Sequence, residues 1–172
     1  QVEVIVLGEK EVSLKVLTKD DCEFDYRESL FKKNENWIIS EVVLVLESKS
    51  QEDIQKEQES IDADWKKRCG SQPYDTPSAG CTFKNIIYTD ELLKYKDWET
   101  HGKVPAGRFI EEADLKGKKI GGAMVSEKHS NFIVNFDNAT ADDVVQLISF
   151  VKTRVRDEFG VQLQEEVQYI GF

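Results

Sequence analysis

The sequence predicts an α+β fold, on three observations. Runs rich in β-branched residues come first and a long polar helix follows them, whereas helices and strands are mixed in the second half. This order differs from the regular alternation of strand and helix that builds a doubly wound parallel sheet. The sequence contains no Gly-x-Gly-x-x-Gly motif, so it does not indicate a dinucleotide-binding fold of that type.

Three strands are expected in the first 46 residues. Residues 2–7 (VEVIVL) and 12–17 (VSLKVL) are β-rich, and residues 8–11 between them are typical of a hairpin loop. Residues 37–46 (WIISEVVLVL) are the strongest strand candidate of the chain, because the run is long and β-branched.

Capping-box spacing marks two helix starts in this part of the chain. Thr18-x-x-Asp21 favours a short helical turn. Ser50-x-x-Asp53 opens a polar helix that extends to about Arg68. Its narrow apolar stripe consists of Ile54, Ile61 and Trp65.

Residues 69–77 contain Gly70, Pro73 and Pro77, which favour a loop and a domain boundary. We therefore expect two pieces, residues 1–69 and residues 70–172. A chain of 172 residues is long enough for one large domain or two small ones.

The second piece has two helices at its centre. Residues 90–98 favour a short helix, and Pro105 suits the first turn of the next one, which Gly117 is expected to end. The apolar residues of this helix fall on one face: Ala106, Phe109, Ile110 and Ala113.

The most clearly marked helix begins at residues 138–140 and carries the capping box Thr140-x-x-Asp143. Gly160 stands at the expected stop. Strands are expected on either side of it, at residues 129–135 and 164–170. The apolar positions of the helix are Val144, Leu147, Ile148, Val151, Val155 and Phe159.

Composition narrows the functional classes. The hydrophobic content of 40% supports a core, and a net charge of −10 argues against a nucleic-acid-binding protein. No apolar run is long enough for a membrane span, and the chain starts at Gln1 without a signal peptide. The three cysteines, Cys22, Cys69 and Cys81, are an odd number without metal-ligand spacing. We expect reduced thiols in a cytoplasmic protein, and no metal site.

Residues 77–85 (PSAGCTFKN) are the most informative stretch. They place the Cys81 thiol after a Ser-Ala-Gly bend, with Lys84 and Asn85 close behind. A thiol, an ammonium group and a carboxamide within five residues make a plausible site for an anionic polar substrate. The alternative is a buried structural cysteine beside a turn, because free cysteine is among the most buried residue types.

Five segments in the same order resemble the UDP-N-acetylenolpyruvoylglucosamine reductase family. Residues 78–85 resemble its proton-donor motif Ser-Ala-Gly-Ser-x-Phe-Lys-Asn, in which some members carry Cys at the second Ser. The other matching segments are YRESLFK at 26–32, AGRFIE at 106–111, IGGAMVSEKH at 120–129 and EVQYIG at 166–171.

The resemblance implies an enzyme that reduces UDP-N-acetylglucosamine enolpyruvate to UDP-N-acetylmuramate with FAD and NADPH, a step of peptidoglycan precursor synthesis. Relatives are far longer before the YRESLFK block, and the Gly-rich flavin segments of the family do not occur here. We therefore expect a fragment. Residues 1–69 would be the last part of the FAD-binding domain, and residues 70–172 would be a small α+β domain that binds the UDP-sugar.

The resemblance also implies three catalytic residues. Cys81 holds the position of the proton donor, and a thiol with an ordinary pKa of ~8.5 is mostly protonated at neutral pH. Arg27 holds the position of the arginine that stabilises the enolate; a surface charge beside Glu28 is the alternative. Glu166 holds the position of the C-terminal glutamate of the site and is preferred over its neighbour Glu165.

Substrate contacts are implied for Tyr26, Lys84 and Asn85. Tyr26 would form a wall of the site, and Lys84 and Asn85 would contact the nucleotide sugar. Lys84 would serve its diphosphate, and a solvated surface charge is the alternative for this residue. Gln72 sits near the place where some relatives carry a lysine for the diphosphate, so that contact is in doubt.

The other positions in and around the matching segments give less information about function. Ile86 and Gln168 depart from the proline and arginine of the family, and neither change removes a catalytic group. Ser126 and His129 lie in a matched block, and a lone His such as His129 is more often structural than catalytic. His101 reads as a loop residue.

Two other functions fit the residues. The chain could be a non-catalytic nucleotide-sugar binding module with the same fold. It could also be a thiol enzyme with Cys81 as nucleophile, which needs a base that neither histidine supplies by closeness in sequence. The sequence gives no indication of an oligomeric state.

Overall fold

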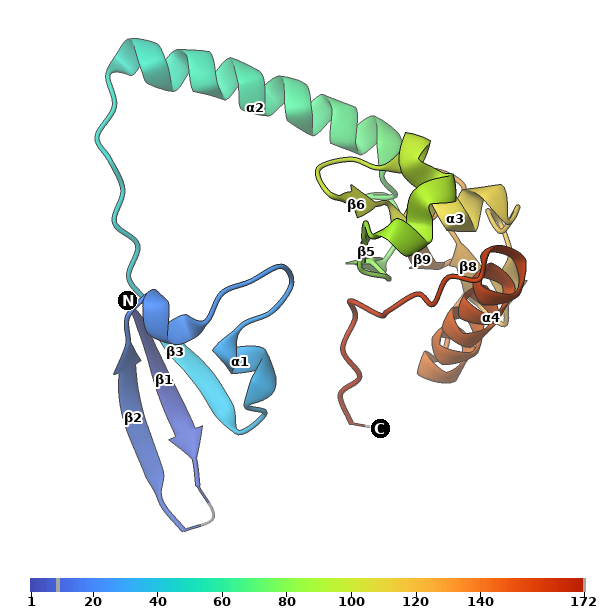
Figure 1. Cartoon of the computed structure of the whole chain (residues 1–172). Helices are drawn as coiled ribbons and strands as arrows, with labels where there is room; N and C mark the ends of the chain where they lie inside the picture. Colours follow the sequence, from blue (N-terminus) through green and yellow to red (C-terminus); the bar gives the residue numbers. More distant parts are fainter. Residues whose placement is uncertain (9, 172) are drawn as a thin grey trace. The chain divides into compact units, whose positions relative to one another are not determined.

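The chain divides into two units, Gln1–Gln55 and Lys56–Phe172. The computed structural model describes residues 1–8 and 10–171. Unit 1 contains a three-stranded antiparallel sheet in the order β2-β1-β3, which Figure 1 shows with β1 in the middle. Its elements are β1 (Val2–Leu7), β2 (Val12–Leu17), the 3₁₀ helix η1 (Asp20–Cys22), α1 (Leu30–Lys33) and β3 (Trp37–Val42).

One face of this sheet is packed and the other is open. Val2, Val4 and Cys22 form a small buried cluster, against which Val6, Leu17, Phe31 and Trp37 pack. Because side chains alternate along a strand, the other face carries Ile5 opposite Leu14 and Ile38. Several large apolar side chains are exposed here, including Leu7, Val12, Leu14, Val16 and Ile38.

Both strands of the predicted hairpin are confirmed, and Glu9 of its loop lies outside the described residues. The capping residues Thr18 and Asp21 also pair as expected: the Thr18 hydroxyl donates to Asp21 Oδ2 at 2.6 Å. The third strand is shorter than predicted, since β3 ends at Val42 rather than at residue 46. Val42 lies opposite Val2, the first residue of β1, so the sheet provides no partner strand for residues 44–46.

The helix α2 (Gln51–Ser71) begins where its capping residues predict, with Ser50 Oγ and Asp53 Oδ2 2.7 Å apart. It continues past Arg68 into the predicted loop, because Gly70 is accommodated in the helix and the Gln72 amide still donates to the Arg68 carbonyl at 2.8 Å. The apolar stripe Ile54, Ile61 and Trp65 is exposed. The boundary between the two units falls within this helix, and a division of domains after residue 69 stays a prediction.

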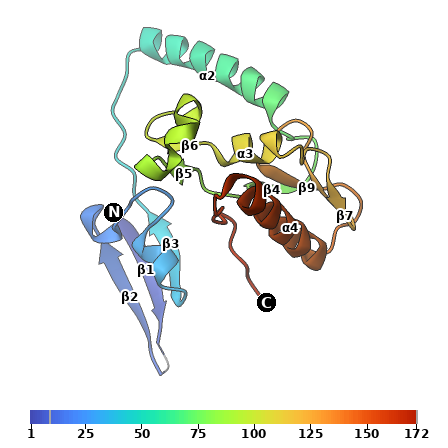
Figure 2. The same cartoon turned by 45° about the vertical axis from the view of Figure 1, so that its right-hand side comes forward.

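Unit 2 is built on a four-stranded antiparallel sheet in the order β4-β9-β8-β7, with a separate pair β5-β6. Figure 2 shows α4 alongside this sheet. The strands are β4 (Ser78–Cys81), β5 (Ile86–Ile87), β6 (Lys103–Val104), β7 (Lys119–Ile120), β8 (Ala123–Val125) and β9 (Phe132–Asn135). The helices are η2 (Asp90–Trp98, 3₁₀), α3 (Ala106–Glu112) and α4 (Ala141–Phe159).

The core of unit 2 lies between the sheet and the helices α3 and α4. The predicted face of α3 is buried, and α4 buries Leu147, Ile148, Val151 and Val155. The predicted capping box of Thr140 and Asp143 is present, and Gly160 ends α4 with a φ of 71°. These observations confirm the α+β fold class.

Two predicted boundaries and one predicted strand in unit 2 are wrong. Helix α3 ends at Glu112 rather than near Gly117, because Asp114 takes a left-handed φ of 55° that a helix does not allow. Strand β9 starts at Phe132 rather than at residue 129, since the Ser126 hydroxyl accepts the amide hydrogens of Lys128 and His129 and holds them in a turn. Residues 164–170 form no regular strand, although Glu165 makes a bridge with Phe83.

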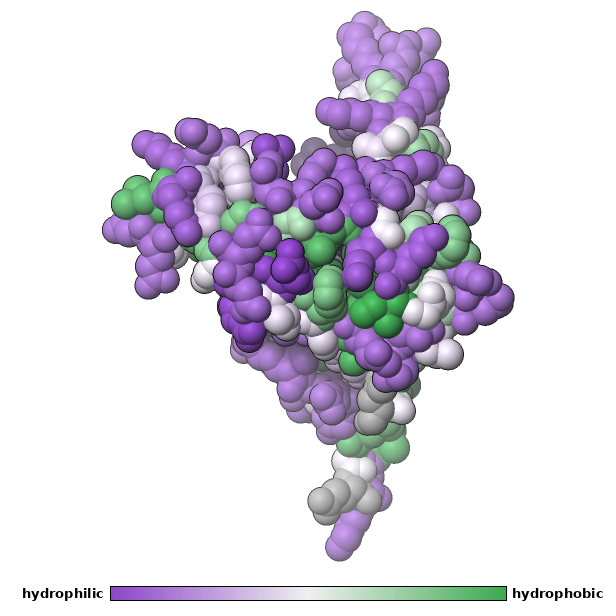
Figure 3. Space-filling view, turned by 90° about the vertical axis from the view of Figure 1, so that its right-hand side faces the viewer, coloured by the Kyte–Doolittle hydropathy of each residue, from purple (hydrophilic) through white to green (hydrophobic). Residues whose placement is uncertain are grey.

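The visible face of the molecule in Figure 3 is largely hydrophilic, with small separate areas of hydrophobic residues. This agrees with a charged content of 33%. None of the helices in the described part of the chain has the length and apolar character that crossing a membrane requires.

Candidate active site

Cys81 ends β4, at an irregular point of the sheet. The register with β9 shifts between Ser78 and Cys81, and Gly80 between them has a φ of 84°, which side chains other than glycine seldom adopt. Cys81 is half-buried and forms no disulfide. The backbone therefore turns sharply just before the thiol, as the Ser-Ala-Gly sequence predicts.

The buried side chain of Asn131 fixes the residues that follow Cys81. Its Oδ1 accepts from the Phe83 amide at 3.0 Å, and its Nδ2 donates to the Phe83 carbonyl at 2.9 Å. The Asn131 carbonyl also accepts from the Thr82 amide at 2.7 Å. Three hydrogen bonds from one residue hold this segment, so the thiol is attached to a rigid backbone.

A segment near the C-terminus pairs with the same residues. The Glu166 amide donates to the Thr82 carbonyl at 2.8 Å, and the Lys84 amide donates to the Gln164 carbonyl at 2.8 Å. The Glu165 carboxylate binds Lys152 on α4 at 2.8 Å. Because successive side chains of an extended segment point to opposite sides, Glu166 is directed away from Lys152.

Cys81 and Asn85 open into the same cavity, which has a volume of about 610 Å³. Asn85 is held at this place because its Oδ1 accepts from the Ala106 amide at 3.2 Å. The cavity is large enough for a small polar ligand. Its other lining residues are Asp97, Trp98, Pro105, Gly107, Arg108, Glu111, Lys116, Lys128, His129, Ser130 and Asn131.

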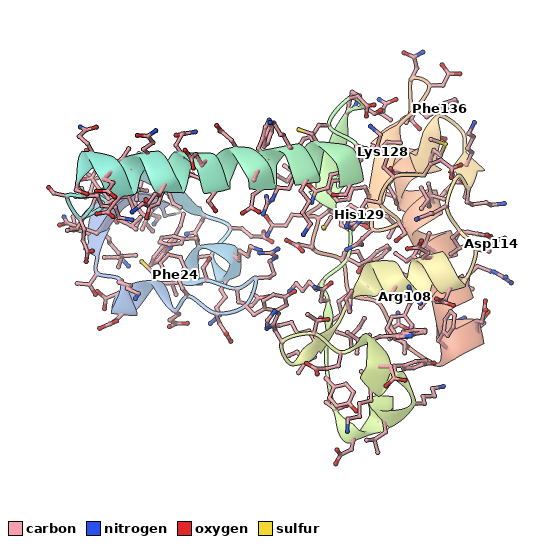
Figure 4. All side chains as sticks on the ribbon, turned by 90° about the horizontal axis from the view of Figure 1, so that it is seen from above. Phe24, Arg108, Asp114, Lys128, His129 and Phe136 are labelled. Atoms are coloured by element: carbon pink, nitrogen blue, oxygen red, sulfur yellow. The ribbon has the colours of Figure 1, made fainter. Side chains whose placement is uncertain are left out.

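Cations outnumber acids among these lining residues, although the whole chain carries a net charge of −10. Lys116 pairs with Glu111 at 2.6 Å, and Lys128 pairs with Asp75 at 2.8 Å. In Figure 4, Lys128, His129 and Arg108 lie along the same side of unit 2. Arg108, the third cation of the lining, pairs with Glu112, so the lining offers N–H donors to a polar ligand rather than an excess of positive charge.

His129 is half-buried in the cavity wall, and its ring meets Phe132 edge-on with the ring centroids 4.9 Å apart. Its Nδ1 accepts from the Asn131 amide at 3.2 Å. Burial lowers the pKa of His129 below its ordinary value of 6.5, and the charge of Lys116 lowers it further. The ring is therefore neutral at pH 7, with its proton on Nε2.

A second cavity, of about 470 Å³, lies between α4 and residues 77–82 and 167–169. Its lining is mainly apolar, with Val144, Ile148 and Val167 among the lining residues, and Cys81 is not one of them. Burial raises the pKa of Tyr169 in this wall.

Tyr26 and Arg27 belong to unit 1. Arg27 has a φ of 58°, which is unusual for a residue with a side chain, and its guanidinium lies 5.6 Å from the centre of the Tyr26 ring. Backbone strain of this kind is frequent at functional sites. The structure thus groups Cys81 and Asn85 around one cavity and pairs the Glu166 backbone with Thr82.

Sequence reasoning missed most of the cavity wall. No sequence pattern singles out Arg108 or Lys116, and the structural role that the sequence favours for His129 stays a prediction. Lys84 and Gln72 are not among the lining residues. No group of His, Cys, Asp or Glu among the described residues could hold a metal ion.

Comparison with known proteins identifies a family. A family model described as UDP-N-acetylenolpyruvoylglucosamine reductase, C-terminal domain, matches residues 72–170. The reductase of that name from Caldanaerobacter subterraneus subsp. tengcongensis is 37% identical over 99% of this chain and 50% of its own length. The one from Bacillus velezensis is 39% identical over 90% of this chain and 45% of its own.

A solved structure of the same family is also similar to this chain. The crystal structure of UDP-N-acetylenolpyruvylglucosamine reductase from Thermus caldophilus matches with a TM-score of 0.66 and 32% identity, over 97% of this chain and 51% of that one. The chain thus spans about half the length of these relatives. Since the family model covers more than half of the 172 residues, the chain belongs to the UDP-N-acetylenolpyruvoylglucosamine reductase family and contains its C-terminal domain.

Proposed function

We propose that this chain is the C-terminal portion of a cytoplasmic reductase that converts UDP-N-acetylglucosamine enolpyruvate to UDP-N-acetylmuramate with FAD and NADPH. Unit 2 holds the nucleotide sugar. The observation that carries this proposal is the shared cavity, which Cys81 and Asn85 line together with the cations Arg108, Lys116 and Lys128. The names of the relatives supply the identity of the substrate.

Cys81 delivers the proton that completes the reduction. Reduction of the enol ether leaves an enolate, whose carbon must be protonated, and a protonated thiol is a suitable general acid. A nearby cation favours the thiolate and opposes this role. In the cavity, Lys116 and Lys128 are each paired with a carboxylate, which offsets their charge.

Arg27 and Glu166 assist the same step. A guanidinium binds a carboxylate through two parallel hydrogen bonds and remains charged at all relevant pH values, which suits an enolate with a carboxylate beside it. The role is assigned to Glu166, whose backbone amide donates to the carbonyl of Thr82, the residue after Cys81. Tyr26 lies beside Arg27, and Asn85 contacts the nucleotide sugar from the cavity lining. Lys84 is assigned a contact with the same substrate from the resemblance alone.

A nucleophilic role for the thiol is less favourable. The only nearby imidazole in the cavity lining is that of His129, whose Nδ1 already accepts a hydrogen bond from Asn131. The neutral ring carries its proton on Nε2, so it has no free nitrogen to take a proton from Cys81. The structure therefore supports an acid at this position rather than a thiol–imidazole pair.

The residues present do not fit a flavin by themselves. The two cavities described above lie in unit 2, and the described residues include no glycine-rich phosphate loop. We derive no step through the flavin, which the relatives' additional length would have to accommodate.

The test uses a full-length protein that contains this chain and follows its two half-reactions separately. Arg27→Ala and Glu166→Ala should slow reduction of the enol ether by about 100-fold or more, because each removes a group that acts only in that step. NADPH oxidation by the flavin should stay nearly intact. Cys81→Ser should keep partial activity, since a hydroxyl can still donate a proton.

Glu165→Ala is the matched control, because it removes a neighbouring carboxylate that faces Lys152. It should leave both half-reactions unchanged. Equal losses in both half-reactions for Arg27→Ala and Glu166→Ala would contradict the assigned roles. A full-length protein that binds the nucleotide sugar but no flavin would instead be a non-catalytic binding module.

A further inference from the structure

Arg108 is a cavity residue to which the motifs assign no role. It is the third residue of α3, and it lines the cavity that contains Cys81. In the matching family motif, Ala-Gly-x-Leu-Ile-Glu, it occupies the variable position. Figure 4 shows it near the start of α3, on the side of unit 2 that also carries His129.

An aromatic cluster fixes the position of Arg108. Its guanidinium carbon lies 5.4 Å from the centre of the Trp98 ring. Trp98 stacks on Tyr95 with the ring centroids 4.9 Å apart, and it meets the buried Phe109 edge-on at 5.2 Å. The Tyr95 hydroxyl donates to the Phe159 carbonyl at 3.0 Å. The ring under Arg108 is therefore held from several sides and cannot move freely.

Among the three cations that line the cavity, Arg108 has the most N–H groups available to a ligand. Lys116 and Lys128 are engaged by Glu111 and Asp75. Arg108 pairs with Glu112 at 2.7 Å, and this pair is exposed, with 50% and 39% of the two side chains accessible to solvent. Such exposed pairs contribute little and rearrange easily. A guanidinium has five N–H donors, so it can bind a phosphate group through two bonds at once.

Arg108 thus combines a fixed place in the cavity lining with N–H donors that suit a phosphate group. We propose that Arg108, positioned by the ring of Trp98, binds the diphosphate of the nucleotide sugar in this cavity. The proposal rests on the function proposed above and names the residue that recognises this part of the substrate.

The test measures binding of UDP and of uridine to the 172-residue chain by isothermal titration calorimetry. Arg108→Ala should weaken UDP binding by about 10- to 100-fold, because a charge-assisted pair of hydrogen bonds is lost. Uridine has no phosphate, so its affinity should not change. The UDP affinity of Arg108→Lys should lie between those of Arg108→Ala and of the unchanged chain, since an ammonium keeps the charge but not the planar fork.

Arg154→Ala is a matched control. Arg154 also pairs with a glutamate four residues on, Glu158, and it is exposed to a similar degree but lies on α4, outside the cavity lining. Arg154→Ala changes the net charge by the same amount as Arg108→Ala, and it should leave the UDP affinity unchanged. Circular dichroism of each variant shows whether the fold is kept.

Trp98 is a positioning residue in this proposal, so its variants have a separate readout. Trp98→Phe keeps an aromatic face for the guanidinium and should retain most of the UDP affinity, whereas Trp98→Leu should lose affinity for UDP but not for uridine. Loss of uridine binding in Trp98→Leu would show that the ring contacts the base, and would overturn the positioning role.

Two failures can be told apart. If UDP binds neither to the 172-residue chain nor to the full-length protein that contains it, both the proposed function and this inference fail. If UDP binds, and Arg108→Ala and Arg108→Lys bind it as tightly as the unchanged chain, the proposed function stands and this inference alone is overturned.

Discussion

Asn131 shows how one residue can organise a site without taking part in its chemistry. Its side chain satisfies both backbone groups of Phe83, its carbonyl binds Thr82, and its amide hydrogen fixes the tautomer of His129. It thus links the two walls of the cavity, one of which carries Cys81 and the other His129. No simple pattern in the sequence distinguishes it from a surface asparagine.

Replacing Asn131 with alanine should therefore destabilise unit 2. The Phe83 amide and carbonyl are buried and would both lose their partner, which costs about 2–4 kcal/mol in the free energy of unfolding. Urea denaturation followed by circular dichroism measures this. Asn131→Asp keeps the acceptor for the Phe83 amide but buries a carboxylate and turns an oxygen toward the Phe83 carbonyl, so it should cost at least as much. A loss of less than about 1 kcal/mol in Asn131→Ala would contradict this organising role.

The two long helices differ in how they are stabilised. Helix α4 has a capping box, a left-handed glycine at its end and a buried apolar face. Helix α2 has a capped start too, but none of its described residues is buried. Since most helical stability in proteins comes from packing of an apolar face, the two helices should respond differently to the loss of a cap.

We expect Thr140→Ala to lower the free energy of unfolding of unit 2 by about 1 kcal/mol, because the amide of Asp143 loses its acceptor. Thr140→Ser keeps the hydroxyl and should be close to neutral. The same change at α2, Ser50→Ala, should not affect the unfolding of unit 2 and should only fray the first turn of α2. Hydrogen exchange of the helix amides distinguishes these results.

At the scale of the molecule, the two units have very different cores. The buried cluster of unit 1 consists of Val2, Val4 and Cys22, whereas that of unit 2 extends over α3, α4 and the sheet. Small cores give small stabilities, because burial must offset the loss of chain entropy. The open apolar face of the unit 1 sheet adds nothing to its stability in this chain.

Unit 1 should consequently unfold at a lower urea concentration than unit 2. Hydrogen exchange with mass spectrometry, at increasing urea, should show loss of protection in β1 before any loss in α4. Val4→Ala should remove the protection of β1 and leave that of α4 unchanged. Loss of protection in both units at the same urea concentration would mean that they unfold together.

An element could be predicted from the sequence where the interactions that form it join residues close together in the chain. The start and end of α4 were predictable, because Thr140, Asp143 and Gly160 act on their own neighbours. Strand β4 could not be predicted, since the short run from Ser78 to Cys81 becomes a strand only by pairing with β9, which lies far along the chain.

The site follows the same rule. Cys81 and Asn85 were found because they lie close together in one recognisable motif. Arg108 and His129 reach the same cavity from α3 and from the turn before β9, and no local pattern reveals such convergence. The roles of Arg27, Glu166 and Lys84 rest on the resemblance and stay predictions.

The pairing of residues 82–84 with residues 164–166 has a consequence for biosynthesis. Lys84 and Gln164, whose backbones are bonded, are 80 positions apart in the sequence. Contacts between such distant residues form late in folding, and a ribosome adds the second segment long after the first. When Cys81 has just left the ribosome, residues 164–166, which pair with the segment after Cys81, have therefore not yet been synthesised. Polypeptides that stop before residue 164 should accumulate with that loop open to oxidants and proteases.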